Sequence, residues 1–361
     1  MAQYIYVSTT GNDANNGASV VTPLRSFKRA MAIAVAGQTV RFVAGTYGSA
    51  TGDDFAQPVP NGVNLERNGS AGGVTFAASG ASLVLAGDAK LSHIALQGFT
   101  MPLGITGGTQ TLTGVAFVNS AGAVIIAGDA RVTMESVSFS GAPSSTEMLL
   151  IQDTARLTWS SGNMSSTFTD CTSAAGLRAL GASHVSLSGV RFDGKWSSGS
   201  QGPAFFDTDG AIKLTTVTFV NECSNTNTSM FVQTSPTATL DIFAGSFGGQ
   251  LAIQPIAAVK VRMSWFYASA GIYLTGTPPN ALDLGRVGDL GGNHFQNTTQ
   301  AAIAAAGAPN LVIDAAGNEW VPNQQGANGS GLYLPVGTMT LLNQFSGRNF
   351  TLASPNTTVR L

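Results

Sequence analysis

The sequence VSLSGVRF at residues 185–192 and the sequence IKLTTVTF at residues 212–219 follow one pattern. In each, two apolar residues alternate with polar ones, and a small or polar bend leads to a second apolar stretch that ends in phenylalanine. Segments with this alternation, named by their last aromatic residue, also end at Phe99, Phe117, Phe139, Phe247, Phe266, Phe295 and Trp320. Their spacing of about 18 to 29 residues is typical of solenoid repeats.

Alternation of apolar and polar residues places one face of each short strand inward. A single repeat cannot bury its apolar face alone, so successive repeats must stack. Stacking places like residues above like, which predicts a column of phenylalanine rings, with Met164 filling the place between Phe139 and Phe192. The pattern therefore predicts an all-β protein built as a parallel β-helix, a solenoid of short strands.

Asparagine follows three of these aromatic residues by two positions, at Asn119, Asn221 and Asn297. Asparagine tolerates the left-handed backbone conformation that a sharp corner needs, and its side chain can bond the neighbouring backbone. These residues predict a stacked asparagine ladder at one corner, and a ligand-binding role for them is the alternative.

The composition suits short strands joined by tight turns. Apolar residues make up 43% of the 361 residues and charged residues 10%, with a formal net charge of −2. Without a basic block, nucleic acid is not expected as a partner. No apolar run is long enough for a membrane span. The low charge favours an extracellular or cell-surface location, no signal peptide is expected in the chain, and the oligomeric state stays open.

The two cysteines, Cys171 and Cys223, lie two repeats apart along the predicted solenoid. Strands spaced by about 4.8 Å would separate them by about 10 Å. That separation exceeds the Cα distance of a disulfide, so two thiols are favoured over a disulfide, and the redox state stays open.

The first residues predict a cap for one end of the solenoid. Residues 4–8 form a strand pattern, Thr22 and Pro23 fit the N-cap and first position of a helix, and Gly37 fits its end. The apolar stripe of this capping α-helix is formed by Leu24, Phe27, Met31 and Val35. Residues 1–361 are expected to form one β-helix domain, with a cap at residues 1–50, coils at about residues 51–350 and a C-terminal end at residues 351–361.

The opening of the chain resembles the DUF1565 group of pectate-lyase-like β-helix proteins. The similar segments are YVS (6–8), GND (11–13), PLRSF (23–27), GQTV (37–40) and GTY (45–47), joined later by LDLG (282–285), GGNHFQN (291–297) and GNEW (317–320). The resemblance implies a right-handed parallel β-helix on an extracellular or cell-surface protein. Relatives with this opening include polysaccharide lyases, and the fold alone does not settle the activity.

Lyases of this superfamily use aspartate-bound Ca²⁺ with a lysine or arginine base, and its hydrolases use clustered aspartates. The weak catalytic candidates on this criterion are Arg191, Asp193, Lys195, Asp207, Asp209 and Lys213. The weak ligand-binding candidates are Arg178, His184, Glu222 and Trp196, which stands on the insertion at residues 194–202 and could stack on a sugar ring. A solvated turn with ordinary ion pairs is the alternative interpretation of this region.

No metal site is expected, and Ca²⁺ remains the alternative. Asp13, Asn15 and Gly17 superficially resemble a calcium loop, but one carboxylate binds Ca²⁺ poorly and a turn is favoured. The three histidines are far apart in the sequence and lack metal-ligand spacing. No other cofactor is indicated.

The scarcity of charge favours a non-enzymatic secreted or surface β-helix that binds a glycan or a protein, or that contributes to the cell envelope. The first alternative is a polysaccharide lyase or glycoside hydrolase acting at the residues between Arg191 and Lys213. The second alternative is a component of a phage or pilus fibre.

Overall fold

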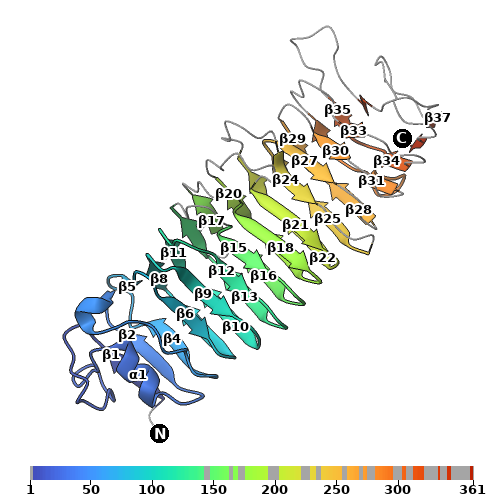
Figure 1. The fold of residues 1–361 in the computed structure, drawn as a ribbon. Helices are drawn as coiled ribbons and strands as arrows, with labels where there is room; N and C mark the ends of the chain where they lie inside the picture. The colour runs from blue at the N-terminus through green and yellow to red at the C-terminus, as the bar shows by residue number, and fades with distance from the viewer. Residues whose placement is uncertain are drawn as a thin grey trace. The chain divides into compact units, whose positions relative to one another are not determined.

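A computed structural model describes residues 3–141, 147–161, 166–169, 175–193, 203–220, 228–232, 237–253, 258–267, 271–274, 281–295, 303–305, 312–320, 332–333, 340–342 and 358–360. It divides into two compact units, Met1–Ser173 and Ala174–Leu361. Within each unit the strands pair in parallel and recur along the chain in the order sheet A, sheet B, sheet C (Figure 1). Each unit is therefore a right-handed parallel β-helix, as predicted. The prediction of a single domain over residues 1–361 stays a prediction.

In the described part of unit 1, the three sheets contain seven, six and four strands, and there are two short helices. Sheet A contains β1 (Tyr4–Val7), β2 (Thr39–Phe42), β4 (Asn64–Arg67), β7 (Ala89–Ser92), β10 (Thr109–Thr113), β13 (Arg131–Glu135) and β16 (Arg156–Ser160). Sheet B contains β3 (Gly45–Tyr47), β5 (Val74–Ala77), β8 (Ile94–Gln97), β11 (Ala116–Val118), β14 (Ser138–Ser140) and β17 (Ser166–Thr169). Sheet C contains β6 (Ser82–Leu85), β9 (Met101–Ile105), β12 (Val124–Ile126) and β15 (Leu149–Ile151). The helices are α1 (Phe27–Ile33) and the 3-10 turn η1 (Ser49–Thr51).

Unit 2 repeats the three-sheet arrangement. Sheet A contains β19 (His184–Ser188), β22 (Ala211–Thr215), β25 (Thr239–Phe243), β28 (Ala258–Arg262), β31 (Ala281–Gly285), β34 (Val312–Ala315), β38 (Thr358–Arg360) and β37 (Thr340–Leu342). Sheet B contains β20 (Val190–Phe192), β23 (Thr218–Phe219), β26 (Ser246–Phe247), β29 (Trp265–Phe266), β32 (His294–Phe295) and β35 (Glu319–Trp320). Sheet C contains β18 (Leu177–Gly181), β21 (Ala204–Thr208), β24 (Thr228–Val232), β27 (Gln250–Ile253), β30 (Ile272–Leu274), β33 (Ile303–Ala305) and β36 (Leu332–Tyr333).

The predicted phenylalanine column is confirmed in both units. In unit 2 the rings stack nearly parallel, with centroid distances of 4.6 Å, 5.4 Å, 4.9 Å and 4.8 Å along Phe192, Phe219, Phe247, Phe266 and Phe295. All five side chains are buried, so each ring replaces water contact by ring contact with its neighbours in the adjacent coils.

Two details of the column in unit 1 differ from the prediction. Leu96, not Phe99, lies opposite Phe117, because the chain bends at Gly98 before Phe99. Phe168 lies opposite Phe139, the place assigned to Met164, which is outside the described residues. The alternation located the column correctly, but the register of individual strands depends on the length of each bend.

The capping helix is shorter than predicted, and its N-cap is Ser26 instead of Thr22. The Ser26 hydroxyl accepts a hydrogen bond from the Arg29 N–H, as an N-cap residue does. The reason is that Leu24 belongs to the sheet region: its N–H donates to the Tyr6 carbonyl, and its carbonyl accepts from the Ser8 N–H. Of the predicted apolar stripe, Phe27 and Met31 are buried on the helix, Leu24 is buried before it, and Val35, beyond its end, is 43% exposed.

Left-handed residues form the bend between sheet A and sheet B. Glycine takes this conformation at Gly114 and Gly189, and non-glycine residues take it at His93, Ser136, Thr216, Ala244 and Met263. Asn119 also has a positive φ, of 48°, which agrees with the corner predicted there. The other two residues of that prediction, Asn221 and Asn297, lie outside the described residues, as do Cys171 and Cys223.

Across the described ranges, no helix has the length and apolar character needed to cross a bilayer.

Candidate functional site

The predicted catalytic candidates fall on three different sheets of unit 2. Arg191 lies on β20 in sheet B, Asp207 on β21 in sheet C, and Lys213 on β22 in sheet A. Arg191 forms an ion pair with Asp193, with 2.8 Å between Nη2 and Oδ2. Asp209 follows β21, where its N–H donates to a carbonyl of β18. The structure therefore joins Arg191 and Asp193, does not join them to Asp207 or Lys213 through a described contact, and leaves the catalytic role a prediction.

Two of the ligand-binding candidates have structural partners. The guanidinium carbon of Arg178 lies 5.3 Å from the ring centre of Phe205 on the adjacent strand. The Nδ1 atom of His184 accepts a hydrogen bond from the Ala211 N–H at 3.2 Å. The remaining candidates, Lys195, Trp196 and Glu222, lie outside the described residues.

A column of charged residues runs along the outer face of sheet A in unit 2. The strand register places Lys213 beside Asp241, Asp241 beside Lys260, Lys260 beside Asp283, and Asp283 beside Asp314. These residues occupy the outward position of their strands, and neighbouring strands lie about 4.8 Å apart. Opposite charges alternate along the column except at the neighbouring Asp283 and Asp314, and Arg360 lies beside Asp314 on the next strand.

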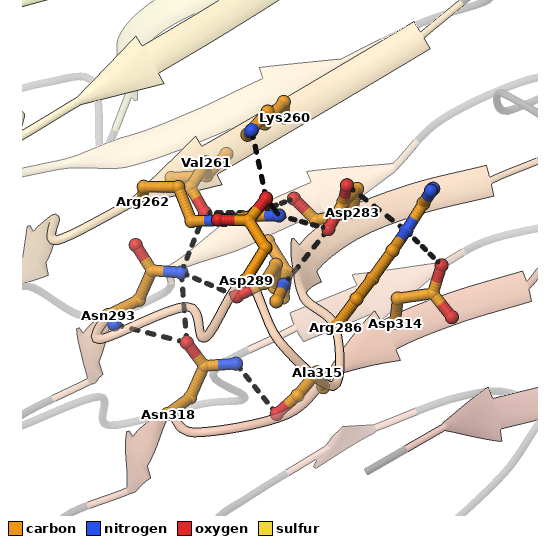
Figure 2. Close-up of polar contacts among 12 residues, drawn as sticks. Lys260, Val261, Arg262, Asp283, Arg286, Asp289, Asn293, Asp314, Ala315 and Asn318 are labelled. Carbon is orange, nitrogen blue, oxygen red and sulfur yellow. Dashed lines mark hydrogen bonds and ion pairs between the residues drawn. The ribbon is translucent and has the colours of Figure 1, made fainter.

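Arg262, at the end of β28, binds carboxylates from a nearly buried position (Figure 2). Its side chain is 5% exposed. Nε and Nη2 donate to Asp289 Oδ1 and Oδ2 at 3.2 Å and 2.8 Å, and Nη2 also donates to Asp283 Oδ1 at 2.7 Å. Nη1 donates to the carbonyls of Val261 and Asp283. Since a guanidinium has five N–H donors, these five contacts occupy all of them.

Two exposed cations complete a group that we call the ion cluster: Lys260, Arg262, Asp283, Arg286, Asp289 and Asp314. Arg286 Nε lies 2.9 Å from Asp314 Oδ2 and 3.2 Å from Asp283 Oδ2, so it bridges the adjacent aspartates. Lys260 Nζ lies 2.9 Å from Asp289 Oδ2. Hydrogen bonds from Arg262 and Lys260 hold the pKa of Asp289 far below its usual range.

An asparagine ladder lies under the ion cluster (Figure 2). The buried Asn293 amide nitrogen contacts the carbonyls of Val261 and Leu284 and the Asn318 side-chain oxygen, at 2.9 Å, 3.0 Å and 2.9 Å. Its side-chain oxygen accepts the Ser264 N–H at 3.0 Å. The ladder satisfies backbone groups of three successive coils and so fixes the strands that carry the cluster.

A shallow hollow of about 390 Å³ opens on the outer face of sheet A beside the ion cluster. Its lining consists of Thr239, Leu240, Asp241, Ala258, Val259, Lys260, Asp283 and Arg286. Two carboxylates and two cations therefore face a space with an apolar floor. Such a lining can donate and accept hydrogen bonds in equal measure.

Exposed aromatic residues lie on sheet B of the same coils, in a group that we call the aromatic ledge: Trp265, Tyr267 and His294. Trp265 and Tyr267 are 50% and 40% exposed and, two positions apart, project on the same side of the chain. The Trp265 ring stacks on the His294 ring at a centroid distance of 4.1 Å, with 31° between their planes.

On the side of Trp265 away from His294, the strand register places residues with short side chains. In the strand register the neighbour of Trp265 on that side is Ser246, followed by Thr218, and both side chains are short. The Tyr267 hydroxyl donates to the Phe219 carbonyl at 3.4 Å, so the tyrosine side chain extends toward the preceding coils. The exposed rings of Trp265 and Tyr267 and the hydroxyls of Ser246 and Thr218 thus belong to neighbouring strands of sheet B.

Two further exposed apolar residues lie between the hollow and the ledge. Phe243 ends β25 and is 49% exposed, and Met263 stands in the bend after β28 and is 52% exposed. Large exposed apolar side chains are thus concentrated on these coils, and such patches mark interaction sites on proteins.

The aspartates of the ion cluster are each paired with a cation, and a carboxylate with a strongly lowered pKa, such as Asp289, is a poor proton donor to a glycosidic oxygen. Within the described ranges, no three side chains of the His, Cys, Asp and Glu types are grouped closely enough to hold a metal ion.

The sequence analysis named Lys213, which lies in the charged column of sheet A, as a catalytic candidate. It did not identify the ion cluster or the aromatic ledge. One signal was present for the ledge: Trp265 immediately precedes the core residue Phe266, so the alternation assigns it to the outer face. A second signal was the shared position of Asn293 and Asn318, two residues before Phe295 and Trp320. For Asp289 no signal was available, because it lies in a turn outside the repeat.

Residues 9–148 match the family model described as "Protein of unknown function (DUF1565)", which confirms the resemblance found in the opening of the chain. Among solved structures, a rhamnogalacturonan lyase is 13% identical over 98% of this chain and 86% of its own, with a TM-score of 0.27. Pectate lyase Pel9A is 16% identical over 87% of this chain and 76% of its own, also with a TM-score of 0.27. These scores are too low to argue from. A comparison with curated proteins gives no match.

Proposed function

We propose that this chain is a non-catalytic β-helix that binds a glycan outside the cytoplasm, at the aromatic ledge and the hollow of unit 2. The observation that carries this proposal is the half-exposed Trp265 ring, stacked on His294 on one side and bordered by the short Ser246 on the other. Aromatic rings held in this way offer a rigid apolar face with little loss of conformational freedom on binding.

The polar surroundings support a sugar as the occupant. Ser246, Thr218 and the Tyr267 hydroxyl lie on the side of Trp265 away from His294. The hollow on sheet A of the same coils adds carboxylates and cations. A pyranose has an apolar face of C–H groups and a rim of hydroxyls, which fits a site with one apolar wall and mixed donors and acceptors.

The paired state of the aspartates supports binding without catalysis. General acid catalysis by a carboxyl needs a proton at working pH, and glycoside hydrolysis needs two carboxyl groups with different protonation. Arg262, Arg286 and Lys260 pair with the cluster aspartates, and the hydrogen bonds from Arg262 and Lys260 lower the pKa of Asp289 and keep that carboxylate ionised.

The test is affinity electrophoresis of the protein through gels that contain one polysaccharide each, followed by isothermal titration with any that retards it. Trp265→Ala is expected to weaken binding at least tenfold, which corresponds to about 1.4 kcal/mol. Val21→Ala, which removes an apolar side chain that is 84% exposed in unit 1, is the control and is expected to bind like the wild type.

Two results would overturn the proposal. One is the absence of retardation by every polysaccharide tested. The other is the appearance of new reducing ends or of unsaturated products absorbing in the ultraviolet, since either product shows that the protein is a hydrolase or a lyase.

A further inference from the structure

We infer that the glycan bound at the hollow and the aromatic ledge is a neutral polysaccharide and not a polymer of uronic acids. This inference rests on the proposed function and adds the chemical class of the ligand. A uronate needs at least one cation whose charge is not already compensated by the protein.

The cations that line the hollow are paired with carboxylates, and the exposed Lys213, which has no ion pair among the described contacts, lies beside Asp241 in the register. Arg262 directs all five of its N–H donors at protein acceptors, among them Asp283 and Asp289. Arg286 bridges Asp283 and Asp314, and Lys260 pairs with Asp289. Transfer of Lys260 or Arg286 to a ligand carboxylate would weaken an ion pair that the protein already makes, and for the 6% exposed Asp314 the loss of the Arg286 contact is costly.

Asp241 adds a carboxylate to the lining of the hollow. It lies beside Lys213 and Lys260 in the strand register, and its side chain is exposed. A carboxylate in this position accepts hydrogen bonds from sugar hydroxyls and repels a second carboxylate. Lys260 and Arg286 retain exposed N–H groups that can donate to hydroxyls, because their side chains are 46% and 56% exposed.

Binding at the aromatic ledge does not require a charged ligand either. The polar groups on the side of Trp265 away from His294 are the hydroxyls of Thr218, Ser246 and Tyr267. Hydroxyls and an indole face recognise the shape of a sugar ring and the directions of its hydroxyls, both of which a neutral sugar supplies.

The experiment compares neutral with acidic polysaccharides of matched backbone in the affinity gels. Hydroxyethylcellulose is paired with carboxymethylcellulose, and highly methyl-esterified pectin with polygalacturonate, alongside neutral xylan, galactan and mannan. We expect retardation by at least one neutral polymer, with at least tenfold weaker affinity for its acidic counterpart. We also expect little change in the neutral affinity between about 50 mM and 500 mM salt, because no charge is neutralised on binding.

Asp241→Asn is the variant that tests the repulsion. It is expected to lower the ratio of neutral to acidic affinity at least threefold, whereas Asp129→Asn, the same change at an exposed aspartate of unit 1, leaves the ratio unaltered. Tighter binding of the acidic polymers that weakens with salt would overturn this inference, while loss of that binding in Trp265→Ala would still support the proposed function. Failure of every polymer to bind would overturn both.

Discussion

Two aspartates of the N-terminal cap show how one residue type can have opposite effects on stability. Asp13 accepts hydrogen bonds from the backbone N–H groups of Arg25 and Ser26 and from the Ser26 hydroxyl. Burial raises the pKa of Asp13, but these hydrogen bonds outweigh it and hold the pKa below its ordinary value of 3.8. The carboxylate thus ties the loop at residues 11–17 to the start of α1.

Asp53 is in the opposite situation. Its side chain is 5% exposed, and it accepts hydrogen bonds from the Lys28 N–H and the Thr51 hydroxyl. Burial raises the pKa of Asp53 above its ordinary value, and the hydrogen bonds offset this only in part. At neutral pH this ionised carboxylate costs stability, whereas Asp13 contributes it.

Asp13→Asn is expected to lower the free energy of unfolding by about 1 kcal/mol at pH 7, because the amide keeps one acceptor oxygen and no charge. The folded pKa of Asp13 is below the unfolded one, so its contribution is present above pH 3.8 and is lost as the pH falls through the folded pKa. Urea unfolding at pH 7 and at lower pH measures this, and an equal loss at every pH would contradict the assignment.

Asp53→Asn is the matched comparison and is expected to be neutral or stabilising at pH 7. Its folded pKa is raised, so the stability linked to Asp53 is largest at low pH and is lost as the pH rises from 3.8 through the folded pKa. The asparagine oxygen can still accept from the Lys28 N–H. A variant that unfolds at clearly lower urea concentration than the wild type would show that Asp53 is not a costly buried charge.

At the scale of elements, the asparagine ladder joins strands that the sheet hydrogen bonds alone do not join. Asn293 precedes β32 in sheet B, yet its side chain contacts Val261 of β28 and Leu284 of β31, both in sheet A. Asn318 continues the ladder by donating to the Ala315 carbonyl of β34. At the bend between the two sheets, side chains therefore satisfy backbone N–H and C=O groups that the sheet hydrogen bonds do not satisfy.

Asn293→Ala is expected to destabilise unit 2 by about 3 kcal/mol, because it removes the side-chain partner of the Leu284 carbonyl and of the Ser264 N–H, and leaves the Val261 carbonyl with Arg262 alone. Asn293→Asp should be no better, since a carboxylate would face the same carbonyls. The measurement is the urea midpoint of each variant. Asn16→Ala, at an exposed turn of unit 1, is the control, and equal midpoints for Asn16→Ala and Asn293→Ala would show that the ladder contributes nothing.

At the scale of the whole molecule, the fold was predictable because stacking requires the same alternation of apolar and polar residues in every repeat. The sequence analysis located Phe192, Phe219, Phe247 and Phe266 in one core column, and the strand register pairs each with the next. The ion cluster was not predictable in the same way. Asp289 follows Arg262 by 27 residues and lies in a turn, and the alternation of apolar and polar residues does not specify the path of that turn.

The same stacking limits how far a local change can spread, because each coil contacts its neighbours in the stack. Phe247 lies between Phe219 and Phe266, at centroid distances of 5.4 Å and 4.9 Å. Phe247→Ala is expected to cost about 3 to 5 kcal/mol through the cavity it leaves. Hydrogen exchange of amides in β23, β26 and β29 should accelerate, while exchange in β5, β8 and β11 of unit 1 stays at the wild-type rate.

Phe243→Ala is the control for this prediction, because it removes the same side chain four residues earlier, where the ring is 49% exposed on the outer face. Its effect on the free energy of unfolding should stay within about 0.5 kcal/mol, as for other surface substitutions. If Phe247→Ala accelerated exchange in unit 1 as strongly as in unit 2, stability would be shared along the whole chain, and the nearest-neighbour description of the coils would be wrong. Equal losses in the two variants would instead mean that the ring column is not the source of the stability of unit 2.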